Sequence, residues 1–359
     1  MPLDHYVTLG RSGLRVSPLC LGTMTFGEDW GWGTSVEDSQ RILDRFIERG
    51  GNFIDTANMY TKGHSEKIIG DHLGQHAGKR ERLVIATKFT GNLFRGDPNG
   101  GGTNRKAIVQ QCEASLRRLQ TDYIDLYWMH CWDRFTPIDE TMRALDDLVR
   151  AGKVRYVGVS DTPAWKVAQA NLLAEMNSWS RFVGLQIEYS LLQRTVEAEL
   201  TPMAQELGLG VTPWSPLASG VLTGKYTRDG ENRSDRGDWA NAHLTEKTFD
   251  LIDILIDGAK KLDSTPARLA LNWVQNRPGV TSTIIGARRI DQLDDNLACL
   301  DLTIPDEILT KLDEATTPSL PFPSGFLENM AGFFGNGANI DGVQTAEFPM
   351  SPEGDTDRY

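Results

Sequence analysis

The chain has 359 residues, of which 40% are hydrophobic and 24% charged, a composition typical of a globular protein rather than a disordered one. Its formal charge is −12, from 37 basic and 49 acidic side chains, and this charge disfavours nucleic acid and anionic membranes as partners. The length allows either two domains or one α/β domain of about 250 residues with insertions.

The opening residues, MPLDHYVTLG, lack the apolar segment of a signal peptide, and no stretch of the chain approaches about 18 apolar residues. We therefore expect a cytoplasmic protein without a transmembrane segment. The four cysteines show no CxxC spacing, so free thiols in a reducing compartment are expected. Cys131 adjoins His130 and could be a reactive thiol, although the sequence identifies neither a base nor an oxyanion site for it.

Strand and helix patterns alternate along the chain after a β-hairpin predicted at residues 6–17. Short apolar runs rich in branched residues predict eight strands, at 18–23, 52–57, 83–89, 124–130, 154–160, 182–189, 209–216 and 282–287. Helical patterns between them include 35–50, 104–120, 139–152 and 162–176. Ser35 and Asn104 are the expected N-caps of two of these helices, and Pro163 is expected in the first turn of a third.

This alternation favours a closed (β/α)8 barrel over an open doubly wound sheet. An open sheet would bring phosphates to a GxGxxG turn after its first strand, and LGTMTFG at 21–27 does not supply one. We expect a single barrel domain with its core at about 6–315 and a C-terminal extension at about 318–359. Polar residues 224–245 predict a long surface excursion, and the aromatic but aperiodic extension is expected to pack irregularly on the barrel.

Four polar residues lie at or just after the ends of predicted strands, namely Asp55, Tyr60, Lys88 and His130. Because the carboxyl ends of parallel strands meet at one edge, their side chains should converge. An ammonium group beside a phenol lowers its pKa from about 10, so Tyr60 could serve as an acid near neutral pH. Asp55 would orient Lys88, and His130 could donate to a substrate oxygen.

Each of these residues taken alone also has a purely structural explanation. Asp55 could cap a loop and Lys88 could be a solvated strand end. Tyr60 could be a rim aromatic and His130 a hydrogen-bonded core residue. Four strand-end groups of complementary chemistry are hard to explain by packing, so together they favour catalysis.

Longer motifs extend this pattern, namely FIDTANMYTKGHSEKIIG, GKVRYVGVSD, LQIEYSLLQR, WSPLASGVLTGKY and IIGARRIDQLDDNL. With the four polar residues, they resemble the aldo-keto reductase family over about residues 6–315, and in particular its longer bacterial members, which are similar to potassium-channel β subunits. The resemblance implies NAD(P)H-dependent reduction of an aldehyde or ketone, or the reverse oxidation. It gives Tyr60 the role of general acid and His130 that of orienting the carbonyl, with Asp55 and Lys88 tuning Tyr60. The alternative is an NADPH-binding regulatory or interaction protein with little turnover.

The resemblance also implies contacts to the nicotinamide. Those to the ring and its carboxamide involve Gly22, Thr23, Met24, Asp55, Ser160 and Gln186. Asp161 stands where the family usually has asparagine; its carboxylate can accept from the carboxamide NH2 but cannot donate to its oxygen. It could instead cap the following helix. Trp214 takes the position of an aromatic, usually tyrosine, that stacks on the nicotinamide ring.

Two further segments resemble the phosphate-binding and adenosine-binding parts of the family. The expected pyrophosphate loop contains Ser215, Pro216, Leu217, Ser219, Gly220, Leu222 and Lys225. The expected adenosine segment contains Gly286, Ala287, Arg288, Gln292, Asp295 and Asn296. Because a guanidinium suits a 2′-phosphate, Arg288 and Arg289 predict a preference for NADPH over NADH, although a solvated arginine pair is an alternative.

Aromatic and apolar residues near the strand ends predict a pocket for a bulky carbonyl substrate. The candidates are Trp30, Trp32, Met59, Phe89 and Trp132, with the tail at 322–326. The two tryptophans of the first loop could equally pack against the loop at 91–103. No metal-binding spacing is apparent, and a glycoside hydrolase would have only Asp55 and Glu188 as its carboxylate pair. A small-molecule carbonyl or alcohol is the expected partner, and a homo-oligomer is allowed.

Overall fold

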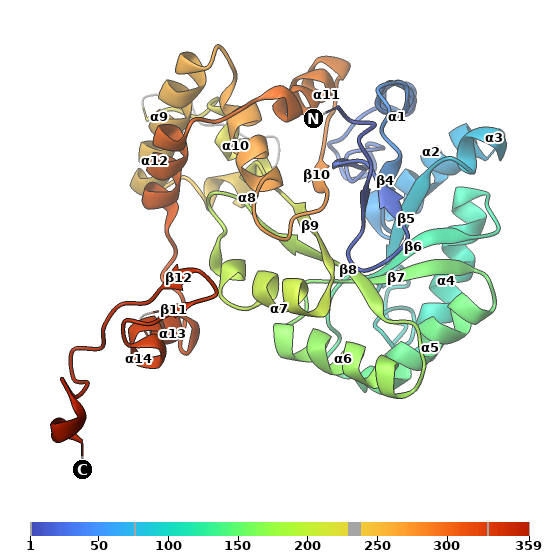
Figure 1. Ribbon diagram of the computed structural model, residues 1–359. Coiled ribbons are helices and arrows are strands. Elements are labelled where there is room, and N and C mark those ends of the chain that lie inside the picture. The colour runs from blue at the N-terminus through green and yellow to red at the C-terminus, as the bar shows by residue number, and fades with distance from the viewer. Residues whose placement is uncertain (1, 75–76, 229–237, 329, 359) are drawn as a thin grey trace.

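A computed structural model, which describes residues 2–74, 77–228, 238–328 and 330–358, shows a parallel barrel ringed by helices (Figure 1). Its eight strands pair in the order β10-β3-β4-β5-β6-β7-β8-β9. The strands are β3 (Leu19–Gly22), β4 (Phe53–Asp55), β5 (Val84–Phe89), β6 (Ile124–Met129), β7 (Val154–Ser160), β8 (Phe182–Glu188), β9 (Gly210–Trp214) and β10 (Thr283–Ile285). A parallel bridge joins Val211 to Val280, and the N–H of Thr281 donates to the carbonyl of Val211 at 2.8 Å. These contacts draw β9 and β10 together and confirm the predicted (β/α)8 barrel.

Two of the three helix starts predicted from capping residues are confirmed among the helices around the barrel. These helices are α1 (Val36–Glu48), α2 (His64–Leu73), α3 (Ala77–Arg80), α4 (Arg105–Leu119), α5 (Ile138–Arg150), α6 (Ala164–Met176), α7 (Leu200–Leu207), α8 (Asp238–Asn241), α9 (Glu246–Lys261), α10 (Pro266–Gln275), α11 (Ile290–Leu297) and α12 (Asp306–Thr316). The side chains of Ser35 and Asn104 accept from the N–H groups of Asp38 and Ala107, as predicted. Pro163 was expected in the first turn of α6, but its ψ of 140° makes it the N-cap.

The interior of the barrel is filled by apolar side chains, and the predicted hairpin closes its N-terminal end. Strands β1 (Val7–Thr8) and β2 (Arg15–Val16) form the hairpin, and Leu9 from its turn enters the interior cluster that also contains Trp128. The Trp128 indole needs glycine on the next strand, because a Cβ at Gly158 would lie 2.3 Å from it. The C-terminal ends of the strands are therefore the end of the barrel left for chemistry.

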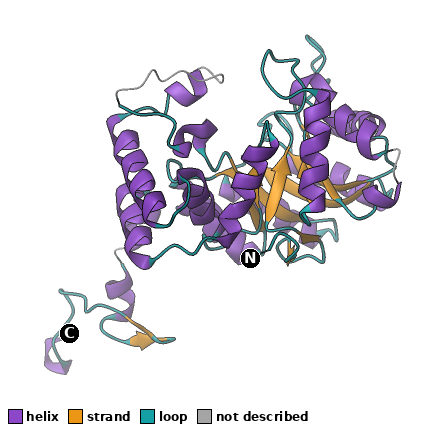
Figure 2. Cartoon of the chain, turned by 90° about the horizontal axis from the view of Figure 1, so that it is seen from above, coloured by secondary structure: helices purple, strands orange, loops and turns teal. Residues whose placement is uncertain are grey.

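The C-terminal extension differs from its prediction. Its elements are α13 (Ser324–Glu328), α14 (Ala331–Gly335), β11 (Asn339–Ile340) and β12 (Val343–Gln344), and both views show them away from the barrel (Figures 1 and 2). The expected packing on the barrel is wrong, since Phe322 is 83% exposed and Phe326 53% exposed. A hydrogen bond of 3.0 Å from the Ser324 hydroxyl to the Ala198 carbonyl ties the start of the extension to the loop after β8.

The predicted excursion at 224–245 is described only at its two ends, which include α8, and its residues 229–237 lie outside the described part. Among the described helices, none combines the length and the hydropathy needed to cross a membrane.

Candidate active site

Three neighbouring strands bring the four predicted polar residues together at the C-terminal end of the barrel. The Lys88 ammonium is 0% exposed and forms an ion pair with Asp55. It also donates to the Tyr60 hydroxyl at 3.0 Å and to the Thr56 carbonyl at 2.9 Å. The Tyr60 and His130 rings meet edge to face, with centroids 6.0 Å apart. The arrangement expected of the four residues is therefore present in space.

The backbone after β4 turns Tyr60 toward Lys88. Tyr60 opens the short 3-10 segment η1 (Tyr60–Gly63), in which Thr61, Lys62 and Gly63 have φ values of 45°, 61° and 93°. Left-handed backbone is costly for residues other than glycine and persists only where the surroundings impose it. The buried Thr61 hydroxyl does so here, since it donates to the Phe26 carbonyl at 2.8 Å and accepts from the Ser65 N–H at 3.0 Å. Thr61 is a positioning residue that the sequence alone did not indicate.

The electrostatics of Tyr60 correct one expectation. Burial raises the pKa of Tyr60 above its ordinary value, and the nearby Lys88 ammonium opposes this increase without overcoming it. The expected net lowering of the phenol pKa is therefore wrong for this state, because desolvation outweighs a charge that Asp55 partly neutralises. Burial lowers the pKa of Lys88, but Asp55 and Tyr60 more than compensate and leave it raised. Lys88 is thus a permanent cation beside a protonated phenol.

His130 is a neutral imidazole at physiological pH. Burial, aided by the Lys88 charge, lowers the pKa of His130 to about 3. A neutral imidazole carries one N–H donor and one acceptor nitrogen. It can therefore donate a hydrogen bond to a carbonyl oxygen without competing with Tyr60 to supply the proton.

The opposite half of the rim comes from β7, β8 and β9. Gln186 donates to Asp55 at 3.1 Å, so its NH2 group is engaged in holding the ion pair. Asp161 follows β7 with a φ of 40°, and its carboxylate accepts from the Trp214 indole N–H at 3.1 Å and from the Ser160 hydroxyl at 3.2 Å. Since Pro163 is the N-cap of α6 and makes no side-chain cap bond, the structure does not support the helix-cap explanation of Asp161.

The C-terminal ends of β3 and β4 meet beside the expected nicotinamide position. The buried Thr23 hydroxyl bonds to the Asp55 carbonyl at 3.0 Å and to the Ser65 hydroxyl at 2.8 Å. Gly22 pairs in register with Asp55, while Met24 is only partly buried. Gly22 and Thr23 therefore lie next to Asp55, as residues lining the ring would.

The segment after β9 has a backbone suited to the close approach of a phosphate. In and around η3 (Ala218–Thr223), left-handed φ values occur at Ser215, Ala218, Ser219 and Gly220. A Cβ placed on Gly220 would lie 3.4 Å from the Lys225 ammonium, so that cation stands directly over the glycine backbone. This combination of bare backbone and a cation fits a pyrophosphate. Pro216 and Leu222 of the same prediction are buried and serve packing.

The segment after β10 fits the expected adenosine end in part. A Cβ added to Gly286 would meet open space, which leaves room for a ligand beside its backbone. Ala287 is buried, with its carbonyl accepting from Thr25 at 3.1 Å. The side-chain Oε1 of Gln292 accepts from the backbone N–H of Arg288 at 3.0 Å, and the Asn296 side chain donates to the Gly286 carbonyl at 3.1 Å.

Two of the expected charged contacts at this end are engaged within the protein. Asp295 forms an ion pair with Arg268 at 2.8 Å, which makes it part of the α10–α11 contact. Arg289 is held by Asp291 at 3.0 Å. Arg288 is partly buried.

Two pairs of tryptophans lie near the C-terminal ends of the strands, and one of them contacts Tyr60. Trp30 packs against Trp32 at 5.6 Å and against Tyr60 at 6.5 Å between ring centroids. The structure thus places Trp30 beside Tyr60, with Trp32 packed on Trp30. Two residues after His130, Trp132 meets Trp165 of α6, with ring centroids 5.7 Å apart, and Trp165 is 58% exposed. Trp165 was missed in the sequence, although its place in the first turn of a helix following a barrel strand could have indicated it.

Two other predicted pocket residues have different environments. Met59 is 38% exposed beside the loop that follows β5. Phe89 is fully buried, with its ring 4.8 Å from that of Tyr127, in the core outside the barrel. Neighbouring residues of a strand face opposite sides, so Lys88 and Phe89 cannot both point to the site. The prediction for Phe89 is wrong.

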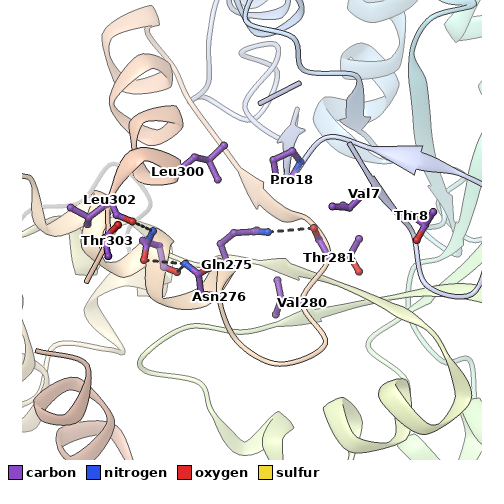
Figure 3. Close-up of a pocket in the computed structure, with 11 residues that line it drawn as sticks. Val7, Thr8, Pro18, Gln275, Asn276, Val280, Thr281, Leu300, Leu302 and Thr303 are labelled. Carbon is purple, nitrogen blue, oxygen red and sulfur yellow. Dashed lines mark hydrogen bonds between the residues drawn. The ribbon is translucent and has the colours of Figure 1, made fainter. Parts of the chain in front are cut away.

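The opposite end of the barrel holds a cavity of about 460 Å³ between the hairpin and α10 (Figure 3). Its lining has no titratable side chain, and Gln275 and Asn276 in it hydrogen-bond to Thr281 and Asn272. This cavity therefore offers no acid–base chemistry.

Cys131 is the exposed cysteine at the rim. Partial burial of its thiol raises the pKa of Cys131, which disfavours a thiolate nucleophile.

Known proteins resemble the chain over most of its length. Residues 18–317 match the Aldo/keto reductase family. The chain is 40% identical to the "Uncharacterized oxidoreductase YrpG" of Bacillus subtilis over 332 residues, covering 89% of this chain and 97% of that protein. It is 35% identical to the norsolorinic acid reductase of Aspergillus flavus over 334 residues, 90% of this chain and 84% of the relative. An aryl-alcohol dehydrogenase [NADP(+)] of Phanerodontia chrysosporium is 33% identical over 356 residues, 93% and 89% of the two chains.

Proposed function

The chain belongs to the aldo/keto reductase family of oxidoreductases, and on that premise we propose that it reduces aromatic aldehydes or ketones with NADPH, or oxidises the corresponding alcohols. The observation that carries the proposal is the Tyr60 hydroxyl, which lies 3.0 Å from an ammonium that is itself paired with Asp55. Residues of about 6–315 would form the catalytic unit. The names of the relatives support the cofactor and the aromatic substrates, since one is an NADP(+) enzyme for aryl alcohols.

The proposed reaction requires a hydride at the carbonyl carbon and a proton at its oxygen. NADPH, whose ring Trp214 would hold, would supply the hydride when bound. The Tyr60 Oη–H donates its proton to the carbonyl oxygen as that oxygen gains negative charge. Lys88 stabilises the phenolate that remains, and this stabilisation develops only as the proton leaves. The net change is one hydride and one proton added across the C=O bond.

His130 would orient the carbonyl in this scheme. Its low pKa keeps the imidazole neutral, so its N–H donates to the carbonyl oxygen in both the substrate and the product. In the reverse direction the same groups act in the opposite sense: Tyr60 accepts the alcohol proton as a phenolate next to Lys88. Microscopic reversibility makes one arrangement serve both directions.

The aromatic preference follows from the rim. Trp30 packs against Tyr60 and Trp32 packs against Trp30, while Trp132, two residues after His130, packs against Trp165. Indole rings near the reacting groups suit a flat substrate, since stacking adds to the burial of apolar surface. The Lys166 ammonium, 4.5 Å from the Trp165 ring centroid, would attract a substrate that carries phenolate or carboxylate groups.

A substrate panel tests the proposal. We expect NADPH consumption with substituted benzaldehydes and aryl ketones to exceed that with aliphatic aldehydes of equal size. Trp30→Leu should narrow this difference by raising KM for the aryl substrates. NADPH binding without consumption across the whole panel would instead favour the regulatory alternative.

A further inference from the structure

We propose that Asp161 makes the protein distinguish the two redox forms of its nicotinamide cofactor, favouring the oxidised form increasingly as the pH rises. The inference rests on the proposed function and deepens it, because it identifies a specificity-determining residue in the same site. A carboxylate in this position adds a negative charge that a neutral amide would not.

The position of Asp161 follows from the two halves of the rim. Asp55, Lys88 and His130 lie on or beside β4, β5 and β6, and a carbonyl held by Tyr60 must lie over them. On the proposed function, the ring that exchanges a hydride with that carbonyl would reach across the rim to β7, β8 and β9, where Gln186 and Trp214 lie. On that side the partly buried Trp214 indole provides a flat surface at the end of β9.

The indole also fixes the carboxylate at its edge. The Trp214 N–H donates to one oxygen of Asp161 at 3.1 Å, and the Ser160 hydroxyl donates to the other at 3.2 Å. The Asp161 N–H is tied to the Gln186 carbonyl at 3.2 Å. A planar ring stacked on this indole would therefore have the carboxylate beside its rim, held by two donors on a backbone that is itself tied to Gln186.

The oxidised and reduced cofactors differ at the ring by one positive charge, while their phosphates and adenosine are identical. The ratio of their dissociation constants thus isolates the electrostatics that face the ring. A partly desolvated carboxylate attracts the cationic oxidised ring and has no such attraction for the neutral reduced ring. The ionised form of Asp161 should accordingly favour oxidised cofactor.

The charge on Asp161 changes within an accessible pH range. Burial raises the pKa of Asp161 to about 6, against the hydrogen bonds from Trp214 and Ser160, which favour the charged form. Glu188 of β8 also raises it and Lys88 of β5 lowers it. Lys88 stays charged throughout, since its own pKa is raised.

Three other groups near Asp161 bear on the pH dependence. The pKa values of Tyr60 and Cys131 are both raised, first by burial and also by the Asp161 charge, so neither titrates near pH 6. Glu188, whose pKa burial raises from its ordinary value, is the competing acid. Glu188→Gln therefore serves as the matched control.

The test is the binding of NADP+ and NADPH, measured by quenching of tryptophan fluorescence between about pH 5 and 8, a range that spans the Asp161 titration. We expect the ratio Kd(NADPH)/Kd(NADP+) to rise about tenfold across this range in the native protein, equivalent to one unit of pKa difference between the two complexes. Asp161→Asn should make the ratio independent of pH. Asparagine tolerates left-handed backbone, so this variant should keep its fold.

Two further variants sharpen the assignment. Glu188→Gln should keep the rise in the ratio. Trp214→Phe keeps an aromatic face but removes the N–H that stabilises the carboxylate, so the midpoint should move to higher pH. An unchanged rise in Asp161→Asn, or a rise lost only in Glu188→Gln, would overturn the inference while leaving the proposed function intact. Failure of both cofactors to bind the native protein would overturn the proposed function itself.

Discussion

Replacement of Lys88 by methionine should reduce both the stability and the turnover of the protein. The Lys88 side chain is 0% exposed and donates to Asp55, Thr56 and Tyr60. Methionine fills much of the same volume but leaves Asp55 buried with Gln186 as its remaining donor. Removing one partner of a buried ion pair costs about 3–5 kcal/mol. We expect the free energy of unfolding, measured by urea titration, to fall by this amount.

Turnover should fall for a separate reason. Without the ammonium, the phenolate left by proton transfer has no cation beside it, and the already raised pKa of Tyr60 rises further. General acid catalysis contributes about 10²- to 10⁴-fold, so the rate of carbonyl reduction should drop within that range. Affinity for NADPH should change far less.

A double variant separates the two effects. In Asp55→Asn with Lys88→Met, the buried carboxylate is replaced by a neutral amide that needs no counterion. Most of the lost stability should return, while the rate of reduction stays low. A double variant as unstable as Lys88→Met would refute the buried-pair reasoning. Recovery of turnover together with stability would show that Lys88 acts only through the fold.

Three smaller predictions concern the surroundings of the site. The Asp29 carboxylate is hydrogen-bonded to the His64 imidazole at 2.7 Å, and this bond holds the first loop, with its tryptophans, on α2. Asp29→Asn should therefore raise KM for aryl carbonyls and leave the NADPH dissociation constant unchanged. An unchanged KM would argue against this role of Asp29. Because the pKa of His130 is about 3, the pH–rate profile should show no acid limb from this group between about pH 5 and 7, and an NMR titration that finds it protonated there would contradict its assignment as a neutral donor. Gly158→Ala should lower the free energy of unfolding by about 1–3 kcal/mol through overpacking against Trp128, measured by denaturant titration with the exposed Gly78→Ala as a control that should cost less.

The sequence predicts those parts of the structure that depend on local patterns. Eight apolar runs and the caps at Ser35 and Asn104 appear as expected, because strand burial and N-capping are encoded within a few residues. The convergence of Asp55, Lys88 and His130 follows from the parallel topology, which places every strand's carboxyl end on one rim.

The features that the sequence did not predict depend on contacts between distant residues or on a balance of opposing energetic contributions. The direction of the Tyr60 pKa shift depends on whether burial or the Lys88 charge has the larger effect. A sequence motif does not indicate how these two effects compare. The bond between Trp214 and Asp161 spans two strand ends far apart in the chain. The position of Phe89 could have been predicted correctly, because neighbouring residues of a strand face opposite sides of the sheet and Lys88 already faces the site. The extension after residue 317 lacks a periodic apolar face, so no pattern in it indicates where it lies.

Tyr60→Phe tests the central claim most directly, because it removes one hydroxyl and little else. NADPH binding and the single-turnover rate of aryl aldehyde reduction should be measured side by side, with Tyr6→Phe as the control, since the Tyr6 hydroxyl bonds to the Gly50 carbonyl far from the rim. We expect the NADPH dissociation constant to stay within about twofold and the rate to fall about 10²- to 10⁴-fold, while Tyr6→Phe leaves both unchanged. A Tyr60→Phe protein that reduces the aldehyde at a near-native rate would contradict the account.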